Sequence, residues 1–265
     1  MLLLIPSPGD PVAFHLGALQ PRWYGLLLAL AVVVAAWVTR GQFSRRGLDP
    51  ELVVPIAVCA IPLGLVGARV EHVLTDLTPF VNRPENALFL WRGGLGIYGA
   101  VVGGMLGVLI GCRIVRLPFW IVADCAAPGL ILAQAIGRVG NYTNQELYGR
   151  PSSLPWAIRI DHPLPPYIPG AGFQPTFAYE ALWDLAVLGL LLWFMRRTAN
   201  RVRPGTAFAL YAGLYSFGRL WIETLRVDHA DHVYGQRAEF WVAAAVIVIA
   251  GAAFAVLWRR RAAVG

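Results

Sequence analysis

Apolar residues occur in long runs that alternate with short polar stretches along most of the chain. A helix needs about 20 apolar residues to cross the roughly 30 Å hydrocarbon layer of a membrane, and seven runs reach or approach that length. They lie at residues 23–38, 53–74, 95–115, 119–136, 177–195, 206–223 and 240–258. The pattern therefore predicts an all-α, polytopic membrane protein with about seven transmembrane helices.

Composition supports a membrane protein and argues against an ordinary soluble enzyme. Hydrophobic residues make up 57% of the 265 residues and charged residues only 14%, against about 25% charged residues in soluble globular proteins. Too few polar side chains remain to cover a water-exposed surface of this size. The longest polar segment, residues 140–175, is rich in proline and lacks apolar periodicity. We expect it to form a small extracytoplasmic cap on a single transmembrane domain that spans residues 1–265.

The basic residues are all arginine, and their positions predict the orientation of the chain in the membrane. Basic residues are enriched in short cytoplasmic loops, and twelve of the 22 arginines fall in segments that are cytoplasmic if the N-terminus is outside. These are Arg40, Arg45, Arg46, Arg113, Arg116, Arg196, Arg197, Arg201, Arg203, Arg259, Arg260 and Arg261. We therefore expect an outside N-terminus and an inside C-terminus. The net charge of +7 does not indicate nucleic-acid binding, because no basic run exceeds three residues.

Two polar clusters at the ends of predicted helices are candidates for a functional site. In residues 137–150 (GRVGNYTNQELYGR), Arg138 and Asn141 lie three apart and would share one helix face. At the end of the sixth helix, Arg219 and Glu223 have the spacing of an i,i+4 ion pair. Ionisable residues in or near a membrane span are functional candidates, so we expect an anion-binding site. A polar helix cap and a purely structural ion pair are the alternatives.

Glycine is concentrated around the start of the third predicted helix. Gly94, Gly96 and Gly99 match the spacing of a dinucleotide-binding fingerprint, but neither a preceding strand nor a βαβ unit accompanies them. A glycine hinge followed by a stripe of small residues for close helix packing is the better interpretation. The stripe consists of Gly99, Gly103, Gly107 and Gly111. The three cysteines lack metal-ligand spacing, so we expect no metal site.

Six motifs resemble those of the prolipoprotein diacylglyceryl transferase family. The most specific is GRVGNYTNQELYG at residues 137–149. The others, in family order, are RWYG at 22–25, GAR at 67–69, GGLGIYG at 93–99, QPTFAYE at 174–180 and GRLWIETLR at 218–226. The resemblance extends from about residue 20 to residue 260 and includes the predicted seven-helix topology.

This resemblance implies an enzyme of lipoprotein biosynthesis in the bacterial plasma (inner) membrane. The family transfers a diacylglyceryl group from phosphatidylglycerol to the thiol of the lipobox cysteine that follows a prolipoprotein signal peptide. A thioether forms and glycerol phosphate leaves, at an active site that faces the extracytoplasmic side. The resemblance implies neither a metal nor another cofactor. The expected partners are phosphatidylglycerol, prolipoprotein signal peptides and membrane lipid.

According to this resemblance, the two polar clusters contain the catalytic residues. We expect Arg138 and Arg219 to clamp the phosphate group, because a planar guanidinium pairs with phosphate oxygens. Fixed cationic donors would stabilise the charge that develops on the leaving phosphate. Glu146 and Glu223 are expected to orient these guanidiniums.

Further site residues follow from the same resemblance, with two departures from it. Asn141 is expected to hydrogen-bond the lipid headgroup, Gly149 to permit close backbone approach, and Tyr24 to line the pocket. Tyr98 stands where many family members carry a histidine that has been assigned the role of base. A tyrosine, with a reference pKa of about 10, is a poorer base at neutral pH. Gln174 replaces another frequent histidine, which argues against a direct chemical role there.

The sequence leaves open how the substrate thiol is activated and which class of function the protein has. The substrate thiol has a reference pKa of about 8.5, so either the positive field of the arginines favours its thiolate, or Glu146 or Glu223 takes its proton. We expect the arginine field to dominate. A lipid or small-molecule transporter is the main alternative function, but it predicts internal repeats that the sequence does not show convincingly. A membrane scaffold without catalysis is the third.

Overall fold

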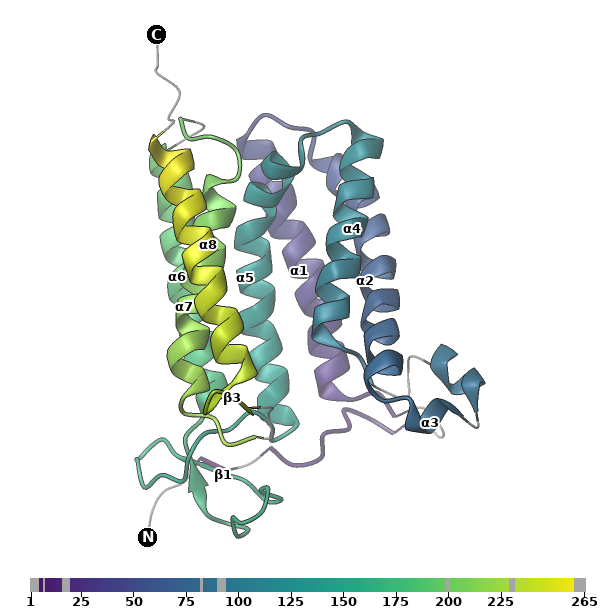
Figure 1. Ribbon diagram of the computed structural model, residues 1–265, viewed down its shortest axis with the longest axis vertical. Coiled ribbons are helices and arrows are strands. Elements are labelled where there is room, and N and C mark those ends of the chain that lie inside the picture. Colours follow the sequence, from purple (N-terminus) through teal and green to yellow (C-terminus); the bar gives the residue numbers. More distant parts are fainter. Residues whose placement is uncertain are drawn as a thin grey trace. The chain divides into compact units, whose positions relative to one another are not determined.

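The computed structural model describes residues 5–6, 8–15, 20–81, 83–89, 94–198, 201–228 and 232–259, which are largely helical (Figure 1). A long helix lies at each of the seven predicted runs, so the all-α prediction is confirmed. The long helices are α1 (Trp23–Arg45), α2 (Val53–Thr75), α4 (Ile97–Val115), α5 (Phe119–Thr143), α6 (Thr176–Thr198), α7 (Thr206–Glu223) and α8 (Ala238–Arg259). Short elements lie between them: η1 (Pro50–Leu52), α3 (Thr78–Val81), η2 (Pro84–Leu88), β1 (Ile158–Arg159), β2 (Gly172–Phe173), β3 (His232–Val233) and β4 (Gln236–Arg237).

Six helices of the described residues are long and apolar enough to cross a membrane. The exception among the long helices is α7, which has 18 residues and carries Arg219 and Glu223 in its last two turns. The prediction of seven long helices holds, but α7 is less apolar than the other six because it carries Arg219, Glu223 and tyrosines. Charges at a buried helix end need partners, and Arg219 pairs with Glu180 and Glu223.

The chain forms two compact units. The first comprises residues 1–38 and 124–265, and the second comprises residues 39–123. In the first unit, α5, α6, α7 and α8 run side by side (Figure 1). Ile131 of α5 packs with Val187 and Leu191 of α6, and residues of α7 surround them. The prediction of one domain over residues 1–265 stays a prediction.

In the second unit, α2 and α4 pack against each other along the predicted glycine stripe. A Cβ atom at Gly103 would lie 2.1 Å from the Leu63 carbonyl oxygen, and one at Gly99 would lie 2.1 Å from the Gly67 carbonyl oxygen. No side chain fits at such distances, so these positions bring the two backbones into direct contact. The small-residue stripe is therefore a packing surface, as predicted.

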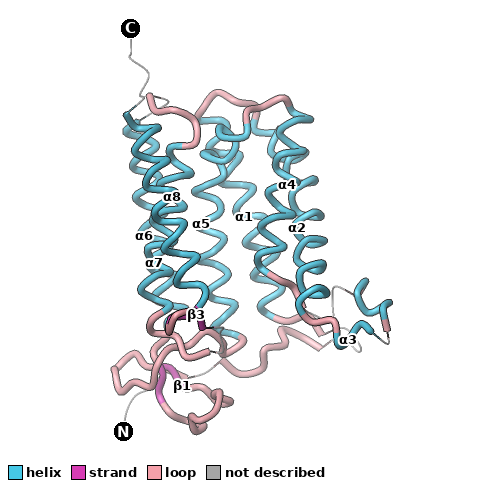
Figure 2. The backbone as a smooth tube through the Cα atoms, viewed as in Figure 1, coloured by secondary structure: helices cyan, strands magenta, loops and turns pink. Residues whose placement is uncertain are grey.

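Residues 144–175 contain no helix and form a small structure of their own, which we call the cap segment (Figure 2). Strands β1 and β2 pair antiparallel, with Ile158 opposite Phe173. The side chains of Tyr148, Ile158, Ile160 and Phe173 are buried together with Phe177 of α6. This apolar cluster fixes the cap segment to the start of α6, which carries site residues.

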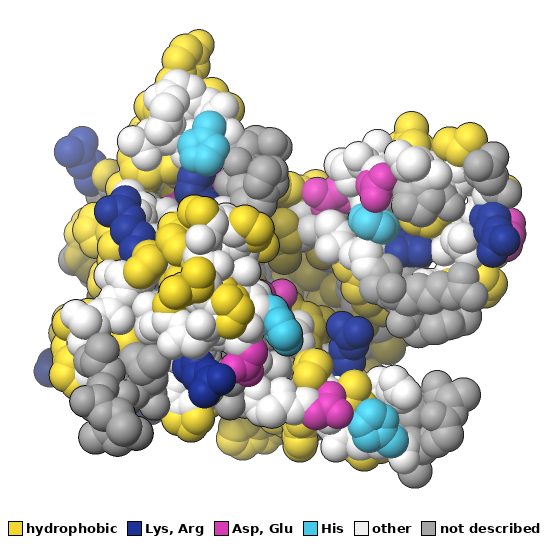
Figure 3. Space-filling model, turned by 90° about the horizontal axis from the view of Figure 1, so that it is seen from below, with side chains coloured by type: hydrophobic (Ala, Val, Ile, Leu, Met, Phe, Trp, Pro, Cys, Tyr) yellow, Lys and Arg dark blue, Asp and Glu magenta, His cyan; other side chains and the backbone are white. Residues whose placement is uncertain are grey.

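The cap segment also exposes hydrophobic side chains. Leu154, Trp156, Leu164 and Ile168 are all exposed. Figure 3, a view from this end of the helices, shows hydrophobic side chains interspersed with basic, acidic and histidine side chains.

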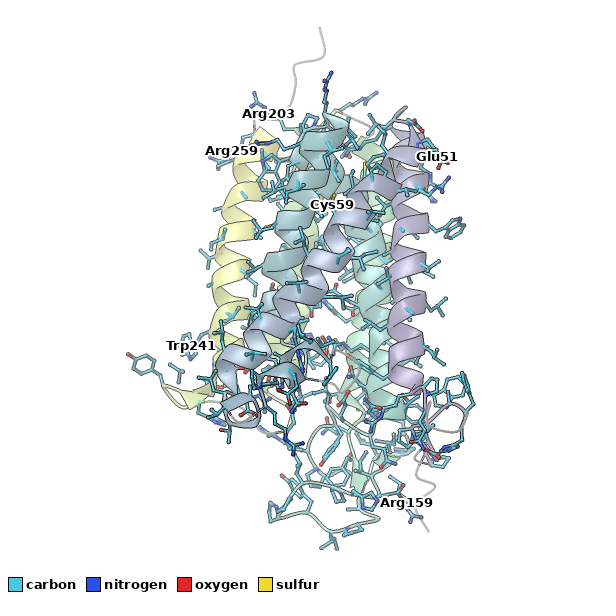
Figure 4. All side chains as sticks on the ribbon, turned by 90° about the vertical axis from the view of Figure 1, so that its right-hand side faces the viewer. Glu51, Cys59, Arg159, Arg203, Trp241 and Arg259 are labelled. Carbon is cyan, nitrogen blue, oxygen red and sulfur yellow. The ribbon has the colours of Figure 1, made fainter. Side chains whose placement is uncertain are left out.

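Arginines lie at both ends of the helices in the first unit. Figure 4 places Arg203 and Arg259 together at one end and Arg159, in the cap segment, at the other. Arg203 and Arg259 belong to the predicted cytoplasmic set. The inside and outside assignment of these ends stays a prediction.

Asp124 joins two helices of the first unit and supports a prediction about stability. Its fully buried carboxylate accepts hydrogen bonds from the backbone N–H groups of Gly205 and Phe208, both at 2.9 Å, at the start of α7. It therefore acts as a helix N-cap supplied by a neighbouring helix. We expect Asp124→Ala to reduce the free energy of unfolding by about 1–2 kcal/mol, and Asp124→Asn to reduce it less. Thermal unfolding in detergent tests this, and an Ala variant as stable as wild type would contradict it.

Candidate active site

A buried cluster of two arginines and two glutamates lies where α5, α6 and α7 meet. Arg138 contacts Glu180 at 3.0 Å, Arg219 contacts the other oxygen of Glu180 at 3.1 Å, and Arg219 also contacts Glu223 at 2.7 Å. The carboxylate side chains are only 3% (Glu180) and 1% (Glu223) exposed. We call these four residues the central cluster. Three of them, Arg138, Arg219 and Glu223, were predicted as site residues, whereas Glu180 was not.

Local structure explains why these side chains converge. Helix α5 continues past its apolar run to Thr143, so Arg138 lies on a regular helix near its end. Helix α6 begins at Thr176, whose hydroxyl donates to the Leu147 carbonyl oxygen at 2.5 Å, and Glu180 follows one turn later. On α7, Arg219 and Glu223 are one turn apart and form the expected i,i+4 pair.

A second layer of charges surrounds Glu223. Arg226 contacts Glu223 at 3.2 Å, and the Nε of Arg237 donates to the other oxygen of Glu223. Both arginines also pair with Asp228, at 2.8 and 3.0 Å. Glu223 is thus bound by three guanidiniums. Arg237 comes from β4, far along the chain, and no spacing rule could have associated it with Glu223.

Asp228 lies in the loop after α7, and these arginines lower the pKa of its carboxyl group. Burial alone would raise the pKa of its carboxyl group, but the hydrogen bonds and charges of Arg226 and Arg237 outweigh burial and hold the pKa below its ordinary value. The ionised form is therefore favoured in the folded protein. The contribution of these ion pairs to stability is present above the ordinary carboxyl pKa and is lost as the pH falls through the lowered value.

Asn141 and Glu146 connect to the central cluster through Arg138. Arg138 donates to the Asn141 side-chain oxygen at 3.0 Å, and the Asn141 amide donates to Glu146 at 2.8 Å. Glu146 is thus linked to Arg138 through Asn141. Tyr24 of α1 lies against α5 at the same level, because a Cβ atom at Gly140 would meet its ring at 2.6 Å.

Arg138 and Arg219 present guanidinium donors of the kind that bind anions. Arg138 and Arg219 together carry two positive charges around one shared carboxylate, Glu180. The Nε of Arg138 is buried and donates no hydrogen bond within the described residues. A planar guanidinium with unused donors binds phosphate oxygens in pairs. The arrangement therefore suits a phosphate group that binds both arginines, either in place of Glu180 or together with it.

Comparison with known proteins identifies the family. The family model for prolipoprotein diacylglyceryl transferase matches residues 11–258. The chain belongs to the prolipoprotein diacylglyceryl transferase family. The sequence resemblance to this family is thereby confirmed.

Three relatives named phosphatidylglycerol–prolipoprotein diacylglyceryl transferase illustrate the similarity. The Frankia alni protein is 48% identical over 97% of this chain and 68% of its own length. The Frankia casuarinae protein is 46% identical over 96% of this chain and 62% of its own length. Transferase 1 of Streptomyces coelicolor is 43% identical over 94% of this chain and 72% of its own length. The chain thus spans roughly two thirds of the length of these relatives.

In this member of the diacylglyceryl transferase family, Gly149 lies in close contact with neighbouring segments of the chain. Its N–H donates to the Gln174 carbonyl oxygen at 2.8 Å. A Cβ atom there would lie 2.7 Å from the Thr176 methyl carbon and 3.0 Å from the Leu225 carbonyl oxygen. Glycine is therefore required to fit the cap segment between the start of α6 and the end of α7. Gly149 thus has a packing role at both helices, and its close approach to a ligand stays a prediction.

Tyr98 lies in the second unit, in the first turn of α4, and its side chain is about half exposed. Residues 91–93, where the glycine-rich motif begins, lie outside the described residues. Arg69 of α2 organises the chain before α4 by donating to the carbonyl oxygens of Ala87 and Gly94, both at 2.9 Å. Glu71 accepts the N–H of Gly99 at 2.6 Å. These contacts fix the start of α4 and hence the position of Tyr98 within its unit.

Proposed function

We propose that this protein transfers a diacylglyceryl group from phosphatidylglycerol to the thiol of the lipobox cysteine of a prolipoprotein. Family membership and the names of the relatives support a transferase that uses phosphatidylglycerol and prolipoprotein, and they do not support the transporter alternative. The structural observation that carries the proposal is the convergence of Arg138 and Arg219 on the buried carboxylate of Glu180.

The reaction needs electrostatic stabilisation of a leaving phosphate. The thiol sulfur forms a bond to the glyceryl carbon, the carbon–oxygen bond to phosphate breaks, and its electron pair stays on the phosphate oxygen. Arg138 and Arg219 would bind that phosphate as its charge increases. Glu180 would hold both guanidiniums in place before substrate arrives, so little reorganisation accompanies the chemical step.

The distribution of charge supports a site at the extracytoplasmic face of the bacterial plasma membrane. The central cluster lies at the end of the first unit's helices that adjoins the cap segment, opposite the end that carries Arg203 and Arg259 (Figure 4). If the arginine-rich end is cytoplasmic, the cluster faces outward. A lipobox cysteine would then meet the phospholipid headgroup near the extracytoplasmic surface of the plasma membrane.

A reconstituted transfer reaction tests the proposed function. Purified protein in nanodiscs that contain phosphatidylglycerol is incubated with a lipobox peptide that has a single cysteine. We expect mass spectrometry to show the diacylglyceryl adduct on the peptide. A peptide with serine in place of cysteine, and nanodiscs of phosphatidylcholine, should give none. Absence of the adduct with folded protein and phosphatidylglycerol would refute the proposal.

Tyr98 provides a separate prediction about thiol activation. If the positive field of Arg138 and Arg219 favours the thiolate, the phenol hydroxyl is dispensable and Tyr98→Phe retains most of the transfer activity. The initial rate of adduct formation at neutral pH is the measurement. Near-complete loss of activity in a variant that melts like wild type would show that the hydroxyl takes part.

A further inference from the structure

Helix α4 ends in a backbone conformation that arginine rarely adopts. Arg116 directly follows the last residue of α4 and has a φ of 56°, in the left-handed region. Its N–H and that of Leu117 both donate to the Cys112 carbonyl oxygen, and such hydrogen bonds commonly close a helix at a left-handed residue. Glycine is the usual residue there, because a Cβ atom disfavours the left-handed conformation.

The second unit contains another helix end of this kind, and that one uses glycine. After α1, Gly47 has a φ of 71°, and the N–H of Leu48 donates to the Phe43 carbonyl oxygen at 2.9 Å. The corresponding hydrogen bond after α4 joins Leu117 to Cys112 at 3.0 Å. The turn itself therefore needs no side chain. An arginine in this strained position after α4 suggests that its side chain has a function.

Arg116 lines a pocket of about 390 Å³ at this end of α4. Arg113 lines the same pocket, and both residues are exposed. Neither guanidinium forms an ion pair or a hydrogen bond with another residue that the structure describes. Arg40 of α1, by contrast, pairs with Glu51. Two positive charges thus meet in one pocket without an acidic partner from the described part of the chain.

The rest of the pocket is predominantly apolar. Its walls include Leu109 and Phe119. Toward the middle of α4, Leu106 and Ile110 are exposed, and they share the helix face of Arg113 because they precede it by seven and three residues. A ligand that fits these surroundings combines a negatively charged group with a hydrocarbon chain.

We propose that this pocket binds the phosphate group of an anionic phospholipid, whose acyl chains lie along the exposed apolar face of α4. Arg113 and Arg116 line one pocket, so both guanidiniums can donate to the same phosphate. Basic pockets between transmembrane helices bind lipid headgroups in this way. Free inorganic phosphate has the same anionic chemistry, but the apolar walls favour a lipid. The inference goes beyond the proposed transferase function, because neither arginine belongs to the central cluster.

Lipid binding by variants of the pocket tests this proposal. Phosphatidylserine, an anionic phospholipid other than the proposed substrate, is titrated into delipidated protein in a neutral detergent, and native mass spectrometry gives its Kd. We expect Arg116→Gly and Arg113→Gln each to raise that Kd by about 10-fold. Arg45→Gln, which removes an exposed arginine of the same unit that does not line the pocket, should leave the Kd unchanged. Phosphatidylcholine should bind equally weakly to all four proteins.

Arg116→Gly also separates lipid binding from a structural role. Glycine fits the left-handed conformation, so the melting temperature without lipid should be at least that of wild type. An unchanged Kd in either pocket variant, a lower melting temperature of Arg116→Gly, or displacement of the lipid by equimolar inorganic phosphate would each overturn the proposal. The same increases in Kd should appear in an Arg138→Ala background, which distinguishes binding at this pocket from binding at the central cluster.

Discussion

Arg138→Lys is expected to lower kcat by about 100- to 1,000-fold, the loss typical of removing a preorganised donor from a developing negative charge. Lysine keeps the charge but presents one point donor in place of a planar fork. Arg138 contacts Glu180 at 3.0 Å and Asn141 at 3.0 Å through two different nitrogens. Lysine cannot reproduce both contacts, so the cation would no longer be aimed at the phosphate. The rate of adduct formation at saturating phosphatidylglycerol is the measurement.

Arg159 offers a matched control for this substitution. It lies in the cap segment, its side chain is 59% exposed, and it pairs with Asp161 at 3.2 Å. An exposed pair of this kind contributes little to stability, so Arg159→Lys should leave kcat unchanged. Wild-type kcat in Arg138→Lys, with the control also unchanged, would contradict the assignment of Arg138 to the phosphate clamp.

Glu223→Gln is expected to reduce the free energy of unfolding by about 3–5 kcal/mol, because removing one partner of a buried ion-pair network leaves uncompensated charge. Glu223 is 1% exposed and binds Arg219, Arg226 and Arg237. With glutamine, the three guanidiniums would retain Glu180 and Asp228 as their acidic partners among the described residues. Thermal unfolding in detergent should show a lower melting temperature, with loss of transfer activity.

An exposed glutamate provides the comparison for Glu223. Glu51 pairs with Arg40, and its side chain is 65% exposed. The same substitution there, Glu51→Gln, should change the free energy of unfolding by about 0–1 kcal/mol. If both variants had melting temperatures close to that of wild type, the network around Glu223 would contribute nothing measurable to stability.

The helices were predictable because the thickness of a membrane imposes a length on apolar runs. Helix ends were less predictable, since polar residues also continue a helix. Helix α1 was expected to end at residue 38 but extends to Arg45, and Phe43 in that extension is fully buried. Helix α5 extends from the expected residue 136 to Thr143, which places Arg138 and Asn141 on regular helix.

The site was predictable only where its contacts are local. Arg219 and Glu223 follow the i,i+4 rule, and Arg138 with Asn141 follows the i,i+3 rule. Glu180 contacts arginines from two other helices, a relation that depends on tertiary packing and leaves no spacing signal. Arg237 was missed for the same reason.

The most direct test of the account measures both products in one reaction. Wild type and Arg138→Ala, each shown to be folded in nanodiscs that contain phosphatidylglycerol, are incubated with the lipobox peptide, and the peptide adduct and glycerol phosphate are quantified together. The assignment of Arg138 to the phosphate clamp predicts equal amounts of the two products from wild type and almost none from Arg138→Ala. Adduct formation by Arg138→Ala at the wild-type rate, or release of glycerol phosphate by wild type without adduct, would contradict it.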